Sequence, residues 1–105
     1  MHIVTEKELG AFIRKKKNVI LLFYASWCPY CRGFLKILEK NTDRLRNDVV
    51  GINIDDDKSP IWDDYKIDIV PTLIAFHNGK EFARRDGVPQ VGLGLDELLQ
   101  LDGML

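Results

Sequence analysis

The sequence predicts an α/β protein, with a mostly parallel sheet covered by helices on both faces. Short apolar runs rich in β-branched and aromatic residues alternate with segments whose apolar residues recur at helical spacing. The pair Asn78-Gly79 favours a tight hairpin and adds an antiparallel strand pair, so we expect a mixed central sheet of four to five strands. Leu, Ile, Val and Phe make up one third of the 105 residues, which is enough for one core. We therefore expect a single domain over residues 1–105.

The chain is expected to begin with a short strand at Ile3 and Val4, followed by a helix that ends at about Lys16. Thr5 and Glu8 have the spacing of a capping box, in which the hydroxyl accepts an early helix N–H and the glutamate reaches back. Apolar residues then recur at helical spacing, which predicts a helix with one buried side.

The run Val19–Ala25 is apolar throughout, as expected of a central strand buried on both faces. Pro29 suits the first turn of a following helix, where its missing N–H would have had no partner. We expect that helix to end near Asn47. Its inward stripe is predicted to contain Cys31, Leu35, Leu38, Thr42 and Leu45.

A third strand is predicted at Val49–Ile54, and a short helix at Ile61–Tyr65. The segment Asp55–Pro60 between them contains three consecutive carboxylates. These acids lack the alternation and the terminal Glu of a calcium loop, so we interpret the segment as a solvated loop with helix-capping acids.

The last strands are predicted at Thr72–Phe76 and Glu81–Arg85, on either side of the Asn78-Gly79 turn. The segment Asp86–Pro89 then breaks the chain. A closing helix is indicated by the spacing of Leu95, Leu98, Leu99 and Leu101.

Composition excludes several classes of function. Lys plus Arg number 15 and Asp plus Glu number 16, so the net charge is −1 and there is no basic excess for binding nucleic acid. The longest unbroken apolar run, Val19 to Phe23, is five residues long, or seven with Tyr24 and Ala25, and is far too short to span a membrane. The first residues lack the pattern of a secretory signal, so we expect a cytoplasmic protein.

The two cysteines, Cys28 and Cys31, form a C-x-x-C at the predicted strand-to-helix junction. A disulfide across so small a loop constrains the unfolded chain little, so stabilisation alone is a poor reason for the pair. A thiolate at a helix N-terminus is stabilised by unpaired N–H groups and by the helix dipole. Cys28 is therefore expected to be the exposed attacking thiol, and Cys31, one turn later, the more buried resolving thiol.

Two other interpretations of the cysteines remain open at this stage. A zinc site would need four ligands, and the chain offers His2, Cys28, Cys31 and His77, although their spacing matches no usual zinc motif. An inert buried pair is the second alternative, but the polar turn around the cysteines does not favour it. We expect no bound metal and no cofactor besides the Cys28–Cys31 pair.

Several segments together resemble the thioredoxin family over nearly the whole chain. Phe23–Cys31 resembles its active-site segment, Gly51–Asp55 its third strand, Ile69–Leu73 its cis-proline loop and Phe76–Glu81 its terminal hairpin. The resemblance implies the thioredoxin fold, with Cys28 as nucleophile and Cys31 as resolving thiol. It also implies a cis bond before Pro71, a Val70 backbone that pairs with substrate peptide, and active-site support from Pro29 and Tyr30. Trp27 would offer an apolar docking surface, with ordinary packing as the alternative for this side chain.

Two departures from the family pattern stand out. The family's buried Asp, six residues before the first cysteine, is replaced by Leu22, and its partner Lys in the third strand is replaced by Gly51. Losing both charges together need not destabilise the protein. The dipeptide between the cysteines is Pro29-Tyr30, which is typical of glutaredoxins rather than thioredoxins and indicates a more oxidising protein.

These observations predict an enzyme, a thiol–disulfide oxidoreductase that reduces protein disulfides through a mixed-disulfide intermediate. Its expected partners are disulfide-containing client proteins and an electron donor, either a thioredoxin-reductase-like enzyme or a low-molecular-weight thiol. We expect a monomer. The alternatives are a glutathione-linked, glutaredoxin-like reductase, a protein disulfide oxidase or isomerase, and, from another class, a metal-binding or docking module.

Overall fold

A computed structural model describes all residues, 1–105, and contains five strands, four α-helices and one 3-10 helix. The element order is the predicted β-α-β-α-β-α-β-β-α. The strands are β1 (His2–Val4), β2 (Asn18–Tyr24), β3 (Val49–Asn53), β4 (Thr72–His77) and β5 (Lys80–Asp86). The helices are α1 (Glu6–Lys15), α2 (Pro29–Asn41), α3 (Ile61–Asp64) and α4 (Leu95–Met104), with the 3-10 helix at Thr42–Arg44.

The five strands form one mixed sheet in the order β1-β3-β2-β4-β5, with β2 at its centre. β1, β3 and β2 are parallel, whereas β4 and β5 are antiparallel to their neighbours. Because β2 is covered on both faces, nearly all of its residues are buried, as its unbroken apolar run predicts. The fold class is therefore confirmed.

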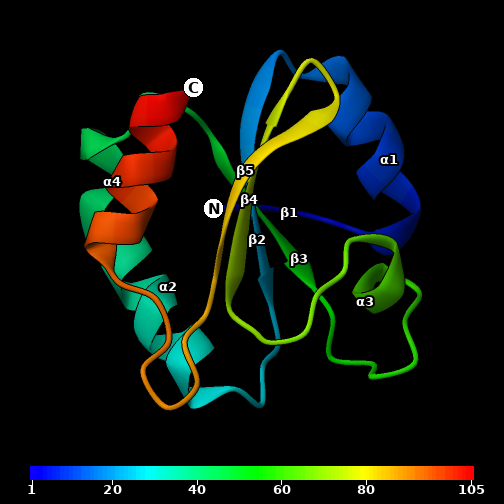
Figure 1. Cartoon of the computed structure of the whole chain (residues 1–105), viewed down its shortest axis with the longest axis vertical. Coiled ribbons are helices and arrows are strands. Elements are labelled where there is room, and N and C mark those ends of the chain that lie inside the picture. Colours follow the sequence, from blue (N-terminus) through cyan, green and yellow to red (C-terminus); the bar gives the residue numbers. More distant parts are fainter.

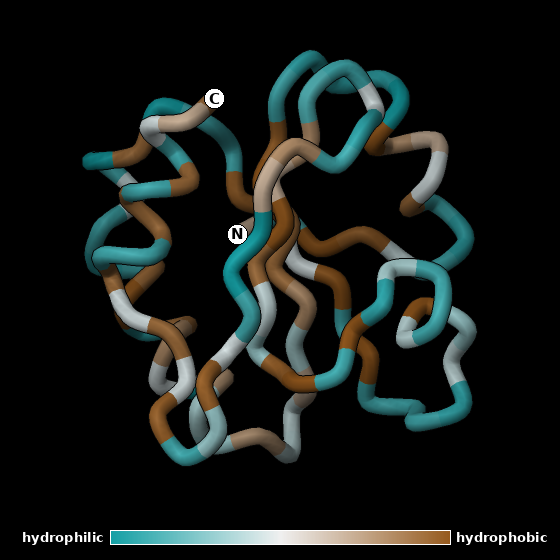
Figure 2. Tube along the Cα trace, in the orientation of Figure 1, coloured by the Kyte–Doolittle hydropathy of each residue, from teal (hydrophilic) through white to brown (hydrophobic).

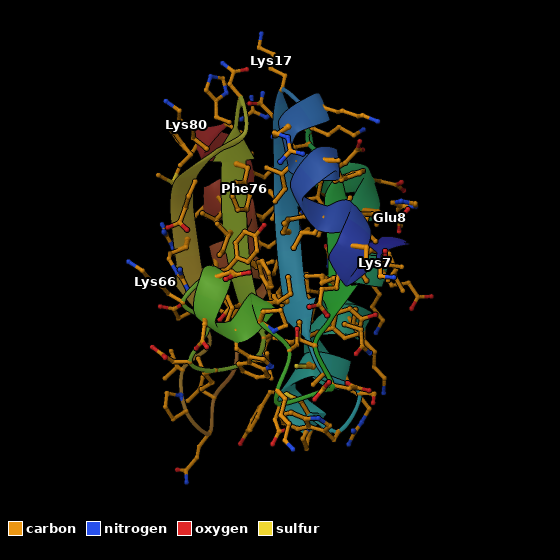
Figure 3. All side chains as sticks on the ribbon, turned by 90° about the vertical axis from the view of Figure 1, so that its right-hand side faces the viewer. Lys7, Glu8, Lys17, Lys66, Phe76 and Lys80 are labelled. Carbon is orange, nitrogen blue, oxygen red and sulfur yellow. The ribbon has the colours of Figure 1, made fainter.

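Helices cover both faces of the sheet: α1 and α3 lie on one side and α2 and α4 on the other (Figure 1). The apolar segments run through the middle of the molecule and the hydrophilic ones lie outside (Figure 2). A single cluster of 27 buried residues forms the core. On the α1 and α3 side, Phe76 packs edge-on against Tyr65, with ring centroids 6.2 Å apart (Figure 3).

The predicted start of α1 is confirmed. The Thr5 hydroxyl accepts a hydrogen bond from the Glu8 backbone N–H at 3.3 Å, and the Glu8 carboxylate accepts one from the Thr5 N–H at 3.0 Å. These reciprocal bonds satisfy two backbone donors that the first helical turn leaves without partners.

The predicted end of α2 is wrong, since the helix ends at Asn41 rather than near Asn47. A long-range contact keeps the last two residues of the predicted helix, 46 and 47, outside it. The buried Asp102 carboxylate of α4 accepts hydrogen bonds from the Arg46 and Asn47 backbone N–H groups, both at 2.9 Å. These donors would bond to helix carbonyls if α2 continued. The inward stripe also differs from the prediction, because Phe34 is buried and Thr42 is exposed.

No helix is both long enough and apolar enough to cross a membrane.

Candidate active site

Cys28 and Cys31 lie where β2 gives way to α2, as the sequence predicts, and both thiols are free. Cys28 is the N-cap residue of α2, and Pro29 occupies the first helical turn. The Cys28 sulfur accepts a hydrogen bond from the Cys31 backbone N–H at 3.1 Å. This sulfur therefore occupies the position at a helix N-terminus where negative charge is stabilised.

Cys31 is the more buried of the two thiols, as expected, but the expectation of an exposed Cys28 is wrong. Cys28 is only 4% exposed and Cys31 is 1% exposed, so both are buried. The cover over Cys28 includes the loop before β4, where the Val70 carbonyl oxygen lies 3.5 Å from the Cys28 sulfur and accepts a hydrogen bond from it. Any group that reaches the Cys28 sulfur therefore has to approach it alongside this loop.

The pKa of the Cys31 thiol is raised from 9.0 to about 12. Burial is the main cause, because it penalises the charged thiolate, and a hydrogen bond with Cys28 raises the pKa further. The neighbouring Arg32 acts in the opposite direction. Cys31 consequently keeps its proton at neutral pH, as a resolving thiol does before its turn to react.

The Val70–Pro71 peptide bond is cis, as the family resemblance implies. The Thr72 hydroxyl donates a hydrogen bond to the Ile69 carbonyl at 2.7 Å and holds this loop together. The end of β5 approaches the loop closely, since a β-carbon added at Gly87 would lie 2.6 Å from the Pro71 carbonyl oxygen. The loop beside Cys28 is thus fixed by a hydrogen bond of its own and packed closely against Gly87.

Apolar side chains surround the cysteine turn on the surface. Trp27 is 57% exposed, and Tyr30 is 42% exposed. Tyr30 packs against the backbone of Gly92, where an added β-carbon would lie 3.0 Å from the Tyr30 Cβ. Val88 and Val91 of the same loop are also exposed. The exposure of Trp27 favours docking over ordinary packing for this side chain.

Asp55 is a site residue that the sequence interpretation missed. Its carboxylate is not merely solvated, because it accepts hydrogen bonds from the Ser26 hydroxyl and the Ser26 backbone N–H, each at 2.6 Å. The bonds from the hydroxyl and then from the N–H hold the pKa of Asp55 below its ordinary value of 3.8. The order of the elements could have indicated this contact. Asp55 follows β3 and Ser26 follows β2, and these two strands are parallel neighbours, so their ends meet at the same edge of the sheet.

The prediction of helix-capping acids is wrong for this segment, because the N-cap residue of α3 is Pro60 and it makes no side-chain capping hydrogen bond. The Asp56 carboxylate accepts a hydrogen bond from the Lys58 backbone N–H, and the Ser59 hydroxyl accepts one from the Ile61 N–H at the start of α3. Nowhere in the chain do three or more His, Cys, Asp or Glu side chains gather in a way that could hold a metal ion. His2 instead stacks on Phe12.

The two positions that depart from the family pattern are direct neighbours in the sheet. Leu22 of β2 is fully buried and pairs in register with Gly51 of β3. The space beside Gly51 is filled, because a β-carbon there would lie 2.7 Å from the Met1 Cε and 3.0 Å from the Tyr24 Cε1. Apolar and aromatic groups thus occupy the place of the charged pair.

The fold is a mixed sheet with helices on both faces. Its dithiol lies at the N-terminus of α2 and faces a cis-proline loop. These features together define a thiol–disulfide oxidoreductase. The thioredoxin family model matches residues 1–94. The chain belongs to the thioredoxin family.

Known relatives agree with this assignment. The chain is 37% identical over 83 residues to the thioredoxin-like protein slr0233 of Synechocystis, covering 78% of this chain and 79% of the relative. It is 36% identical over 87 residues to a thioredoxin of Chlamydia pneumoniae, covering 82% and 83%. The crystal structure of Chlamydomonas reinhardtii thioredoxin f2 superposes with a TM-score of 0.82 over 99% of this chain and 94% of that one, at 17% identity. The glutathione-linked, oxidase and metal-binding alternatives are not favoured by these relatives.

Proposed function

We propose that this oxidoreductase reduces disulfide bonds in client proteins, with Cys28 as the nucleophile and Cys31 as the resolving thiol. The observation that carries the proposal is the placement of the Cys28 sulfur at the N-cap of α2, where it accepts the Cys31 backbone N–H. A thiolate at that position is stabilised, and the thiolate is the form that attacks a disulfide.

The proposed reaction has two exchange steps. The Cys28 thiolate attacks one sulfur of the client disulfide, so a Cys28–client bond forms, the client S–S bond breaks and the other client sulfur leaves and takes a proton. Cys31 then loses its proton and attacks the Cys28 sulfur, which releases the second client thiol. The client has gained two electrons, and the enzyme is left with a Cys28–Cys31 disulfide. Two electrons from a donor restore the dithiol.

The surroundings of the dithiol would align the client. The backbone of Val70 at the cis-proline loop lies beside Cys28, which supports a role in pairing with the client's backbone next to Pro71. The exposed rings of Trp27 and Tyr30 would contact apolar side chains near the client disulfide. Pro29 would start α2 without leaving a backbone donor unpaired.

The Pro29-Tyr30 dipeptide between the two cysteines is expected to affect the reduction potential of the pair. We propose a reduction potential above that of a common thioredoxin, in the direction of glutaredoxins. Potentials in this family of folds span roughly 150 mV, and every 30 mV corresponds to about 1.4 kcal/mol for a two-electron couple. Equilibration in graded redox buffers, with free thiols counted, would measure this potential. A value equal to that of thioredoxin would contradict this part of the proposal.

The partners and location form part of the same proposal. Clients carry accessible disulfides, and a thioredoxin-reductase-like enzyme or a low-molecular-weight thiol returns the electrons in the cytoplasm. The protein acts as a monomer without a bound cofactor. Cell fractionation with antibody detection would test the location, and light scattering the monomeric state.

The proposed function is tested by two cysteine variants. Cys28→Ser is expected to abolish reduction of a model protein disulfide such as that of insulin. Cys31→Ser is expected to accumulate a covalent mixed disulfide that a reducing agent releases, because the resolving step is lost. Non-reducing electrophoresis would detect the trapped complex. Activity in Cys28→Ser, or a Cys31→Ser variant that traps nothing, would contradict the proposed roles.

A further inference from the structure

Ser26, two residues before Cys28, is held at every polar group it has. Its backbone N–H donates to Asp55 Oδ1 and its hydroxyl to Asp55 Oδ2, both at 2.6 Å. Its carbonyl oxygen accepts a hydrogen bond from the Arg32 guanidinium, through Nη1, at 3.1 Å. We call Ser26, Asp55 and Arg32 the Ser26 clamp. The three side chains come from the turn after β2, the end of β3 and the first turns of α2.

Asp55 is itself fixed in place. Its backbone N–H donates to the Asn53 side-chain oxygen at 2.8 Å, and its carbonyl oxygen accepts the indole N–H of Trp27 at 3.3 Å. The strands behind it are joined as well, because the Ile54 N–H donates to the Tyr24 carbonyl at 2.8 Å. A rigid sheet end therefore positions the carboxylate, and the carboxylate in turn positions the cysteine turn.

The turn has little else to hold it. Ser26 and Trp27 are exposed, so no core packing orders them. The backbone bond from the Cys28 N–H to the Ala25 carbonyl, at 3.3 Å, closes the turn itself. The tertiary hydrogen bonds of Ser26 and Trp27 are those of the Ser26 clamp and of the Trp27 indole, and Cys28 adds the bond from its thiol to the Val70 carbonyl. An exposed segment with few packed contacts samples several orientations unless hydrogen bonds select one.

Orientation matters for this chemistry. Attack on a disulfide needs the thiolate, the attacked sulfur and the leaving sulfur in line, so a reactant held in that alignment reacts faster. We propose that Asp55, acting through Ser26 and supported by Arg32, is a positioning residue that holds the Trp27–Cys28 turn in the orientation that reacts with a protein disulfide. This inference rests on the proposed function, and it assigns a role in the reaction to one carboxylate of the Asp55–Pro60 segment.

Three variants of the clamp and one control test the proposal. Asp55→Ala removes both acceptors from Ser26. Asp55→Asn keeps an oxygen for the Ser26 N–H and supplies an amide N–H for the hydroxyl, so it preserves the geometry and removes the charge. Ser26→Ala removes the hydroxyl alone. Asp57→Asn is the matched control, because Asp57 is an exposed carboxylate in the same segment outside the clamp.

Two measurements are made on each variant under conditions where circular dichroism shows it folded. Asp55→Ala is expected to lower kcat/KM for a protein disulfide about tenfold, and Ser26→Ala about threefold, since the reacting geometry is populated less often. Asp55→Asn is expected to recover about half of the wild-type value or more, and Asp57→Asn to stay within about twofold of it. The Trp27 indole resonance, assigned with Trp27→Phe, is expected to shift or broaden in Asp55→Ala and to stay in place in Asp57→Asn.

Several results would overturn the proposal. An Asp55→Ala variant with the activity of Asp57→Asn, or with an unmoved indole signal, would show that the clamp does not orient the turn for reaction. An Asp55→Asn variant as slow as Asp55→Ala would show that the charge acts instead of the hydrogen-bond geometry. A wild-type protein that reduces no protein disulfide would refute the proposed function, and the indole signal would then still decide whether the clamp orders the turn.

Discussion

The turn that precedes Cys28 is held by polar groups, whereas the part of the sheet around Leu22 and Gly51 is apolar. In front of Cys28, the exposed turn is held by a carboxylate, a hydroxyl and a guanidinium. The apolar side is the sheet, where buried Leu22 lies beside Gly51 and the Met1 and Tyr24 side chains lie over the glycine. The comparison shows where polar groups can be placed at little cost. Charged contacts at the water boundary keep much of their hydration, whereas a charge inside the sheet would need a partner.

Burial also governs the ionisation of Cys31. Burial raises the pKa of this thiol to about 12, and no carboxylate replaces the family's Asp at position 22. In the proposed reaction, Cys31 therefore has to give up its proton without an acid–base residue at position 22.

The largest expected effect comes from placing a charge on the apolar side. Leu22→Asp is expected to lower the free energy of unfolding by about 3–5 kcal/mol at neutral pH, because it leaves a carboxylate unpaired in the sheet. Burial would raise the pKa of the new carboxyl, so the loss should shrink as pH falls through that raised pKa and the group becomes neutral. Urea unfolding at several pH values would measure this.

Leu22→Asn is the matched control for that prediction. It has nearly the same shape as aspartate and buries a polar group, but it cannot ionise, so its loss of stability should not depend on pH. Equal stability of the two variants at neutral pH would contradict the prediction, because it would mean that water reaches position 22 and hydrates the carboxylate.

The elements of the fold follow from local patterns, whereas the end of α2, the burial of Cys28 and the role of Asp55 depend on contacts between distant segments. Alternating strands and helices, the Thr5 capping box and the Asn78-Gly79 hairpin each depend on a few neighbouring residues and were predicted correctly. The end of α2 was missed because Asp102, 56 residues beyond Arg46, captures the backbone there. No local signal at position 46 announces that contact.

The site shows the same division. The strand-to-helix placement of the cysteines and the cis bond before Pro71 were predicted from motifs. The burial of Cys28 was missed because its cover comes from Val70, 42 residues away. The role of Asp55 was missed because Ser26 lies 29 residues earlier, and only the parallel pairing of β2 with β3 brings them together.

The buried Cys31 thiol is expected to ionise only at high pH. In Cys28→Ser, Cys31 is the only thiol, and its alkylation by iodoacetamide is expected to be slow at neutral pH. The rate should keep rising as pH increases beyond 9.0, the ordinary thiol value, toward about 12, because burial is the main cause of the raised pKa and remains in this variant. Mass spectrometry of timed samples would give the rates. A rate that levels off near pH 9.0 would show that the thiol is hydrated, and unfolding must be excluded by circular dichroism at each pH.

The smallest expected effect, and the sharpest test of the front side, comes from adding one methyl group at Gly87. The added carbon would lie 2.6 Å from the Pro71 carbonyl oxygen, so the cis-proline loop beside Cys28 has to move. Gly87→Ala is expected to cost about 1–3 kcal/mol of unfolding free energy and to slow the reduction of a protein disulfide. Gly33→Ala is the matched control, because its added carbon meets nothing within 4 Å in α2, and it should stabilise the protein by up to about 1 kcal/mol through helix propensity. Thermal or urea unfolding and insulin reduction measure both. If Gly87→Ala were as stable and active as Gly33→Ala, the cis-proline loop could shift without cost. The position of that loop would then not matter for the reaction.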